Sequence, residues 1–323
     1  MTLVRIAVIA VLMGMVAGAG ATPTPDYPTK PVRIITGSTG SFADIVLRQL
    51  AQRLSERWGQ PVVVENRGGA GLTIGTAIAA KAPSDGYTLL VSDRTAISAA
   101  PSLYQNLAYD PVKDLAPVTL VATTPLVLVT LPSVPASNLR EFIAYAKQLP
   151  QGLPHGTGGP GTVNHLAGEL MKQLTGANLV PVHYKGTGAA MVGILGGEVK
   201  AGFSMPPIAL PHLRVGKVKA HVITSRNRFA GAPDIPTVIE AGLPDLESEY
   251  WIGVLAPART PPALVKRLNS DFVEILKTPA IRTPLLDQGA VAAPGTPNEF
   301  AAFIGSETRK WGQVIKAAGI KPQ

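Results

Sequence analysis

The sequence predicts an α/β protein with two doubly wound lobes and a cleft between them. Short runs rich in Val, Ile and Leu alternate with stretches whose apolar residues recur at helical spacing, which is typical of parallel strands joined by crossover helices. A chain of 323 residues is also long enough for two domains. Two apolar runs, at 118–121 and 126–130, are separated by Thr-Thr-Pro, which we interpret as the first crossing between the lobes.

Residues 1–21 have the three parts of a secretory signal peptide. Arg5 provides positive charge, residues 6–21 are uncharged, and Ala19-Gly20-Ala21 provides small residues for cleavage. We expect cleavage after Ala21 and export of the mature chain. A membrane anchor is the alternative, but a spanning helix needs about 20 apolar residues, and this run is shorter and contains three glycines.

The first lobe is predicted at 22–122. Its first helix is expected at 43–58, because Leu47, Leu50 and Leu54 recur at helical spacing and Gly59 ends the pattern. A second helix is expected at 72–81, after a glycine-rich turn. The expected strands of this lobe are the apolar runs at 32–36, 62–65 and 88–92.

The second lobe is predicted at 123–246, and residues 247–323 are expected to return to the first lobe. A break at 232–236 and an apolar run at 251–256 mark the return, and three helical stretches follow, the last ending at Ala318. The second lobe is expected to contain strands at 126–130, 180–183, 201–204 and 220–224 and helices at 138–148, 163–174 and 191–195.

The composition excludes several kinds of site. The chain has no cysteine, which excludes disulfides, a catalytic thiol, a thiolate metal site and a lipid-anchoring cysteine. The net charge is +8, but lysines and arginines are scattered singly, so we expect no nucleic-acid partner. The positive charge would attract an anionic solute or simply keep the protein soluble. Because no hydrolase elbow, zinc-protease motif or phosphate loop occurs, we expect no catalytic residue, metal or cofactor.

Two glycine-rich segments, one in each predicted lobe, are the candidate ligand site. Residues 36–41 (TGSTGS) open the first helix, and residues 155–162 (HGTGGPGT) open the helix at 163–174. Backbone N–H groups, hydroxyls and the positive end of a helix together bind anions, so both segments could hold one carboxylate from two sides. The second also fits G-x-G-x-x-G, but residues 171–197 lack the acidic residue that contacts ribose in nucleotide sites, which argues against nicotinamide binding.

Each candidate also has a structural interpretation. Ser41 is suited to cap the first helix, and Asp44 would favourably face its dipole. His165 lies one turn into a helix and is either a ligand contact or a structural group. An exported ester or amide hydrolase using His165 with Asp44 or Glu169 stays an alternative. The full set of candidate ligand-binding residues is Gly37, Ser38, Thr39, Gly40, Ser41, Phe42, Asp44, Thr95, Thr157, Gly158, Gly159, Thr162, His165 and Ser204.

Ordered motifs across the whole mature chain resemble those of a known family. The motifs are YPTKPVRII (27–35), VVVENRGGAG (62–71), SDGYTLL (84–90), LAYDP (107–111), HLAGE (165–169), YKG (184–186), APDIPT (232–237) and WIGVLAP (251–257). On these motifs, the chain is similar to the periplasmic solute receptors of the tripartite tricarboxylate transporter family, also called Bug receptors.

The resemblance implies two lobes of the periplasmic binding protein type that close on a small organic acid. It implies that backbone amides, hydroxyls and waters hold the carboxylate of a citrate-like acid, dicarboxylate, acidic amino acid, aromatic acid or nicotinate. A monomeric receptor would deliver this ligand to a membrane permease with one large and one small subunit. Signalling to a membrane sensor kinase is the alternative role within this family.

The first glycine-rich segment departs from the family pattern. Family members usually carry Pro-Phe-x-x-Gly-Gly after the first strand, whereas residues 36–42 read TGSTGSF, which we interpret as one residue shorter, so that Phe42 is displaced. Residues 157–159 read Thr-Gly-Gly where Ser-Ser-Gly is common. Because the first loop lines the pocket in the family, the resemblance leaves the identity of the solute open.

Overall fold

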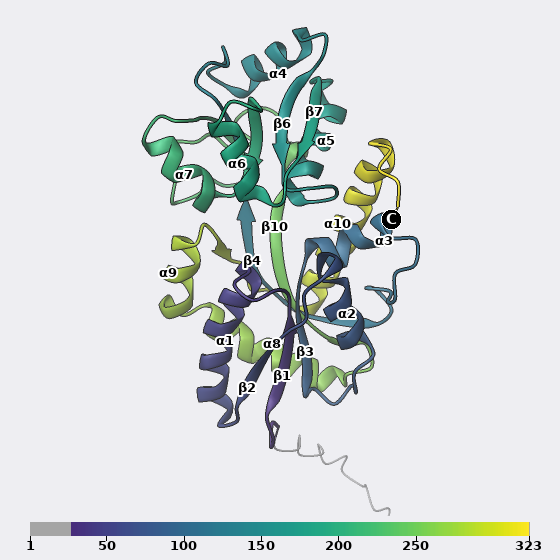
Figure 1. Cartoon of the computed structure of the whole chain (residues 1–323). Helices are drawn as coiled ribbons and strands as arrows, with labels where there is room; N and C mark the ends of the chain where they lie inside the picture. The colour runs from purple at the N-terminus through teal and green to yellow at the C-terminus, as the bar shows by residue number, and fades with distance from the viewer. Residues whose placement is uncertain (1–26, 323) are drawn as a thin grey trace, which may run out of the picture.

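The computed structural model describes residues 27–322, so the predicted signal peptide and cleavage site lie outside the described residues. Two sheets form two lobes, which confirms the predicted fold class (Figure 1). Among residues 27–322, every helix is too short or too polar to span a bilayer. In sheet order, the first lobe contains β11 (Val291–Ala292), β4 (Leu115–Pro125), β10 (Glu249–Pro257), β3 (Thr88–Asp93), β1 (Val32–Thr36) and β2 (Val62–Asn66). The second contains β7 (Leu179–His183), β6 (Leu153–Thr157), β8 (Ala201–Ser204), β5 (Val127–Thr130) and β9 (Lys219–Ile223).

Helices cover both sheets, and short helical turns occur at Ala70–Leu72, Thr95–Ala99 and Pro244–Leu246. The longest helix spans 21 residues and begins with a capping box in which Thr296 and Glu299 bond each other's backbone N–H groups. The helices are α1 (Phe42–Trp58), α2 (Thr73–Ala80), α3 (Ala100–Leu103), α4 (Leu139–Gln148), α5 (Val163–Thr175), α6 (Thr187–Leu195), α7 (Pro206–Arg214), α8 (Pro262–Leu276), α9 (Pro279–Asp287) and α10 (Pro297–Ala317).

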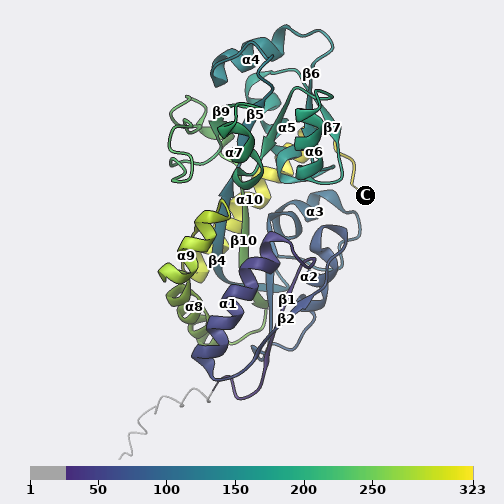
Figure 2. The same ribbon diagram turned by 60° about the vertical axis from the view of Figure 1, so that its left-hand side comes forward.

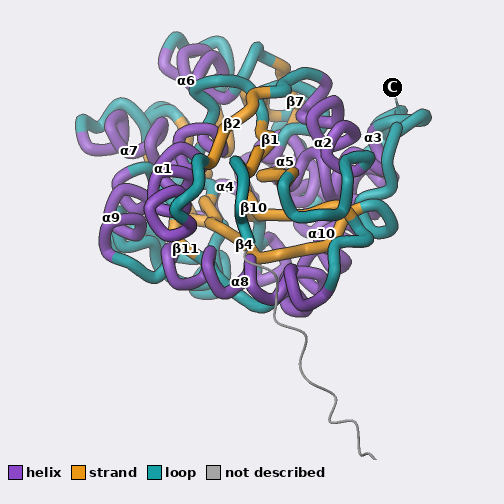
Figure 3. The backbone as a smooth tube through the Cα atoms, turned by 90° about the horizontal axis from the view of Figure 1, so that it is seen from below, coloured by secondary structure: helices purple, strands orange, loops and turns teal. Residues whose placement is uncertain are grey.

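The alternation of side chains along the strands divides the first lobe into two apolar layers. Ile34 and Ile252 face α1 and α8, whereas Ile35 and Trp251 face α2 and α10. Figure 3 shows α1 and α2 on opposite sides of these strands. The final turns of α10 pack instead into the core of the second lobe, through Trp311 and its neighbours. The helix therefore joins both lobes. The predicted boundaries at 122/123 and 246/247 fall inside β4 and just before β10, and we retain them as a proposal.

The strand register places one end of each sheet at the junction between the lobes, and strands such as β4 and β8 run toward this junction. The start of β10 pairs with the end of β4, Glu249 opposite Pro125, and Ile252 pairs with Asp93 at the end of β3. After one residue the chain continues as β5, whose first residue lies opposite Ser204 at the end of β8. Because β1 runs parallel to β3 and β6 parallel to β8, the loops that follow β1 and β6 also point toward the junction.

Thr224 holds both crossing segments together. Its backbone N–H donates to Leu126 O at 2.8 Å, and its hydroxyl accepts from Leu126 N at 2.8 Å. The same hydroxyl donates to Ser248 O, while Ser248 N donates to Thr224 O at 3.0 Å. The Thr224 side chain is fully buried. Thr224, the residue that follows β9, therefore fixes both the segment that enters the second lobe and the segment that leaves it.

Several elements of the structure were not predicted. β6 contains Pro154 and Gly156 with no alternating pattern, and we had assigned residues 155–157 to a loop, which is wrong. The helix predicted at 191–195 begins at Thr187, and α7 was missed because its sequence, PPIALPHLR, contains three prolines. The helical turns that follow Asp93 and the two-residue β11 were also missed.

Thr224→Val should lower the free energy of unfolding by about 2 kcal/mol, because Leu126 N and Ser248 O lose buried hydrogen bonds while the side-chain volume is kept. Urea denaturation followed by circular dichroism measures the change. Thr308→Val is the matched control, since the Thr308 hydroxyl bonds only Ile304 O within α10. Equal stability of the two variants would contradict the role given to Thr224.

Candidate functional site

The loop after β1 is held in shape by a buried carboxylate. Asp44 accepts hydrogen bonds from Gly40 N at 2.9 Å and from Asn66 Nδ2 at 2.8 Å, and Arg48 lies within 3.1 Å of it. Burial alone would raise the pKa of Asp44, but the bonds from Asn66, Gly40 and Arg48 outweigh it and hold the pKa below its ordinary value. Asp44 is therefore ionised and serves as a brace for the loop. It is 2% exposed.

The same loop leaves a group of backbone donors unused at the start of α1. Ser41 caps the helix by accepting from Asp44 N, as expected, and Ser41 N donates to Ser38 O. Among residues 27–322, no atom accepts a hydrogen bond from the backbone N–H of Ser38, Thr39, Phe42 or Ala43. Unused N–H groups at a helix start carry about half a positive charge together. This end of α1 can therefore bind an anion.

Asn164 organises the loop after β6. Its Oδ1 accepts from Gly158 N at 3.2 Å and from the Thr162 hydroxyl at 2.7 Å, and its Nδ2 donates to the Thr187 hydroxyl at 3.4 Å. The side chain is fully buried. The starts of α5 and α6 are thus tied together through one amide. Neither Asn164 nor the corresponding brace Asn66 was predicted from the sequence.

His165 lies inside the second lobe and supports the same loop. Its Nδ1 accepts from Gly161 N at 3.0 Å, its ring meets the ring of His183 edge to face with centroids 4.8 Å apart, and it is 4% exposed. Burial, with the charges of His183 and Lys172, lowers the pKa of His165 to about 4. The ring is therefore neutral at pH 7. Its Nε2 lies 3.9 Å from Glu169, while Asp44 belongs to the other lobe.

The glycines of the second loop serve the backbone more than a ligand. A Cβ at Gly158 would approach Thr187 N to 3.1 Å, and the N–H groups of Gly158 and Gly159 already bond Asn164 and Thr157. The Thr157 hydroxyl pairs with His183 Nδ1 at 2.7 Å. Within the described chain, the unused donors here are the N–H groups of residues 163 and 164, at the start of α5. The donors at this helix start therefore differ from those we had predicted.

Buried hydroxyls without partners lie at the ends of the strands that face each other. Ser204, which was predicted, ends β8, and Thr36, the first residue of the predicted segment 36–41, ends β1. Thr124, which was not predicted, lies next to the end of β4. Each is at most 2% exposed, and none has a hydrogen-bond partner among residues 27–322. Because buried polar groups are normally paired, these hydroxyls are available to bond a polar molecule or water at the junction.

Asp93 and its neighbours connect the end of β3 to this junction. Asp93 Oδ1 accepts from Thr95 N at 2.8 Å, and Oδ2 accepts from the Tyr250 hydroxyl at 2.9 Å. The Tyr250 ring meets Phe42 edge to face, with centroids 6.0 Å apart. The predicted residues Phe42 and Thr95 are thereby placed beside β10, although they lie far apart in the sequence. The displaced Phe42 is half-buried against this tyrosine.

The sequence and the fold agree with one family. The model for the tripartite tricarboxylate transporter family receptor matches residues 46–320. Protein BugT of Bordetella pertussis is 36% identical over 318 residues, which cover 98% of each chain. This chain belongs to that receptor family.

Solved structures of receptors with bound carboxylates share the fold. Rpa4515 of R. palustris, solved with adipate, is 32% identical with a TM-score of 0.78 and covers 92% of this chain and 100% of its own. MatC from Rhodopseudomonas palustris, solved with bound malate, is 33% identical with a TM-score of 0.73 and covers 90% of this chain and 100% of its own.

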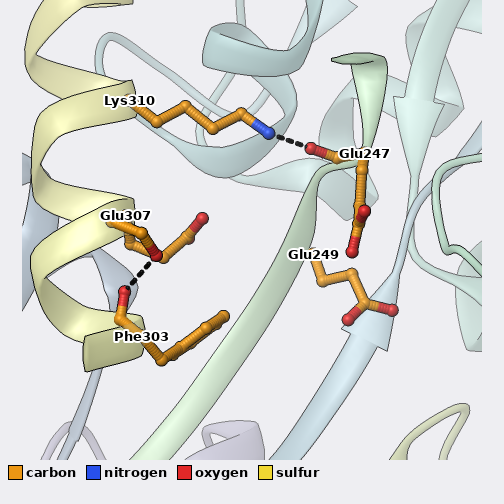
Figure 4. A pocket seen from close by; sticks show the side chains of 6 residues that line it. Glu247, Glu249, Phe303, Glu307 and Lys310 are labelled. Carbon is orange, nitrogen blue, oxygen red and sulfur yellow. Dashed lines mark hydrogen bonds between the residues drawn. The ribbon is translucent and has the colours of Figure 1, made fainter. Parts of the chain in front are cut away.

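A cavity of about 390 Å³ lies beside the crossing strands of this receptor, between β10 and α10 (Figure 4). It is lined by Glu247, Glu249 and Glu307, and Lys310 Nζ donates to Glu247 O across it. Burial, reinforced by the charges of Glu247 and Glu307, raises the pKa of Glu249 to about 7. Its carboxyl therefore titrates near neutral pH at the point where the two lobes join.

Glu249→Gln should gain stability relative to the wild type as pH rises from about 5 to about 8. The pKa of Glu249 is raised in the folded state, so its contribution to stability is full below the unfolded pKa and is lost as pH rises through about 7. We expect the difference in the free energy of unfolding to reach about 2 kcal/mol at pH 8. Urea denaturation across this pH range measures it, with Glu56→Gln on the exposed face of α1 as control. A difference that does not change with pH would count against a raised pKa of the half-buried Glu249.

Proposed function

We propose that this receptor captures a small organic acid in the periplasm and delivers it to a membrane permease of the tripartite tricarboxylate type. The observation that carries the proposal is the pair of helix starts, α1 in the first lobe and α5 in the second, with unused N–H groups at the ends of strands that face each other. An anion between the lobes would meet both positive helix ends.

The electrostatics of this site favour a carboxylate over a neutral sugar. The N–H groups are oriented before the ligand arrives, because Asp44 and Asn66 brace one loop and Asn164 braces the other. Preorganised donors lose little entropy on binding, so the site needs no arginine to hold a charged ligand. The buried hydroxyls of Thr36, Thr124 and Ser204 offer further donors for the oxygens of the acid.

Relatives narrow the class of ligand. Rpa4515 was solved with adipate and MatC with bound malate, and both of these acids carry two carboxyl groups. We propose a dicarboxylate for this receptor as well. Phe42, held against Tyr250, would contact the body of the ligand, so the shortened first loop would select among dicarboxylates by size.

Export to the periplasm and delivery to a permease complete the proposal. The secretory pattern of residues 1–21 and the family to which the chain belongs support export. We propose that the receptor acts by binding and release, with no catalytic step, because His165 Nδ1 is engaged by Gly161 and its ring is neutral and buried.

Isothermal calorimetry with adipate, malate, citrate, benzoate, glutamate and glucose tests the proposal. We expect binding of at least one dicarboxylate, no binding of glucose, and an affinity that falls as salt concentration rises. Binding restricted to the uncharged sugar would refute a carboxylate site. An uptake assay in a deletion strain then separates transport from sensing, which would change gene expression instead.

Asn164→Asp should weaken binding of the dicarboxylate identified in this way at least tenfold. The new carboxylate keeps the acceptor used by Gly158 and Thr162 but adds negative charge at the start of α5, where the ligand anion would lie. Calorimetry measures the affinity, and thermal unfolding verifies that the variant folds. Asn106→Asp, a matched change at an exposed loop position, should leave the affinity unchanged. Equal affinities in both variants would remove the start of α5 from the site.

A further inference from the structure

A second cavity, of about 480 Å³, lies between the two lobes on the side of α9. Its walls come from the loop after β9 in the second lobe and from the end of α8, α9 and β11 in the first lobe. Figure 2 shows α9 beneath the part of the second lobe that carries α7. We call this cavity the α9 groove. Its lining residues are Arg228, Ala230, Lys277, Pro279, Arg282, Thr283, Leu286, Ala290, Val291 and Ala292.

The α9 groove is lined by positive charge alone. Arg228, Lys277 and Arg282 line it, and no acidic residue does. Arg228 is fixed by Glu240, at 2.9 Å, and by the carbonyl of Pro233. Among residues 27–322, neither Lys277 nor Arg282 has a carboxylate within 4.0 Å. Lys277 and Arg282 of the first lobe, both exposed, therefore share a groove with an arginine of the second lobe, and an anion between them would be attracted by all three.

An apolar wall completes the α9 groove. Leu286 is 38% exposed and Val291 is 45% exposed, and Ala290 and Ala292 lie beside them. A cavity of this volume, with a mostly apolar wall and a few charged groups, is typical of sites for small organic molecules. The charge selects an anion, and the apolar wall favours one with a hydrocarbon body.

The α9 groove is separate from the site between the helix starts but is linked to the angle between the lobes. None of the residues of the loops after β1 and β6 lines it. The C-terminal end of α9 is packed so closely against α7 that a Cβ at Gly289 would lie 2.8 Å from Pro207 Cγ and 3.2 Å from Pro206 Cβ. Since α7 follows Ser204 at the end of β8, a change in the groove would be transmitted to the strand ends that face the first lobe.

We propose that the α9 groove is a second anion site, which takes a small organic anion with two or more negative charges and an apolar body. Its occupant links Arg228 of one lobe to Lys277 and Arg282 of the other and so alters the angle between the lobes. This proposal does not depend on the identity of the ligand bound between the helix starts, because the two sites share no residue.

Binding is tested with benzene-1,3,5-tricarboxylate as the probe. The chain has no cysteine, so Thr283→Cys gives one attachment point in the groove for an environment-sensitive fluorophore. We expect a saturable signal, and at least a tenfold loss of affinity when Lys277→Gln and Arg282→Gln are added. Lys266→Gln with Arg309→Gln, which removes two exposed charges on α8 and α10, should leave the affinity unchanged. No saturable signal, or equal affinity in both charge variants, would overturn the site.

The effect on the lobes is tested with spin labels on Arg140→Cys in α4 and Ser270→Cys in α8, both exposed. We expect the probe to shift the distance between the labels, and this shift to persist in Asn164→Asp but disappear in the Lys277→Gln and Arg282→Gln variant. A shift that disappears in Asn164→Asp but persists in the Lys277→Gln and Arg282→Gln variant would show that the probe acts between the helix starts. That result would overturn the proposal. If the receptor binds no dicarboxylate in calorimetry but the probe still shifts the distance between the labels, the proposed function is refuted and the proposal for the α9 groove is not.

Discussion

The buried hydroxyl of Thr224 is the contact on which the arrangement of the two lobes depends. It accepts from Leu126 N and donates to Ser248 O, which belong to the two segments that cross between the lobes. With these segments held together, the antiparallel pair of β4 and β10 sets the position of β3, and the pairing of β5 with β8 sets the position of β6. The loops after β1 and β6 then point toward one junction. A shift at the crossing would move both helix starts relative to each other.

The candidate site uses backbone donors, and side chains act mainly as braces. Asp44 and Asn164 bond the N–H groups of glycines that would otherwise be unpaired, and thereby orient the remaining donors at the starts of α1 and α5. A brace inside its own lobe does not change when the lobes move. Each lobe therefore orients its own half of the candidate site independently of the angle between the lobes.

Local patterns in the sequence predict much of the fold, but not the contacts that connect the lobes. The bounds of α1 follow from Ser41 and from Gly59, whose φ of 62° suits a helix end. Thr224 and Leu126 are 98 residues apart, and no periodicity links them. β6 was missed because Pro154 and Gly156 lower its strand propensity, while parallel pairing with β7 and β8 supplies the missing stability. In the site, the glycine-rich loops were found by composition. Asn66 and Asn164 were not, because their role depends on where their amides point.

Charged residues of opposite sign line the cavities on two sides of the segments that cross between the lobes. Glu247, Glu249 and Glu307 gather next to α10, whereas Arg228, Lys277 and Arg282 gather next to α9. A third cavity, lined by both Glu249 and Arg228, connects the two groups. Part of this charge is compensated, because Arg226 pairs with Glu247 at 3.1 Å, Glu240 pairs with Arg228 at 2.9 Å, and Lys310 lies beside the glutamates. Charged groups therefore lie on both sides of the segments that join the lobes, where a change in the angle between the lobes would alter the distances between them.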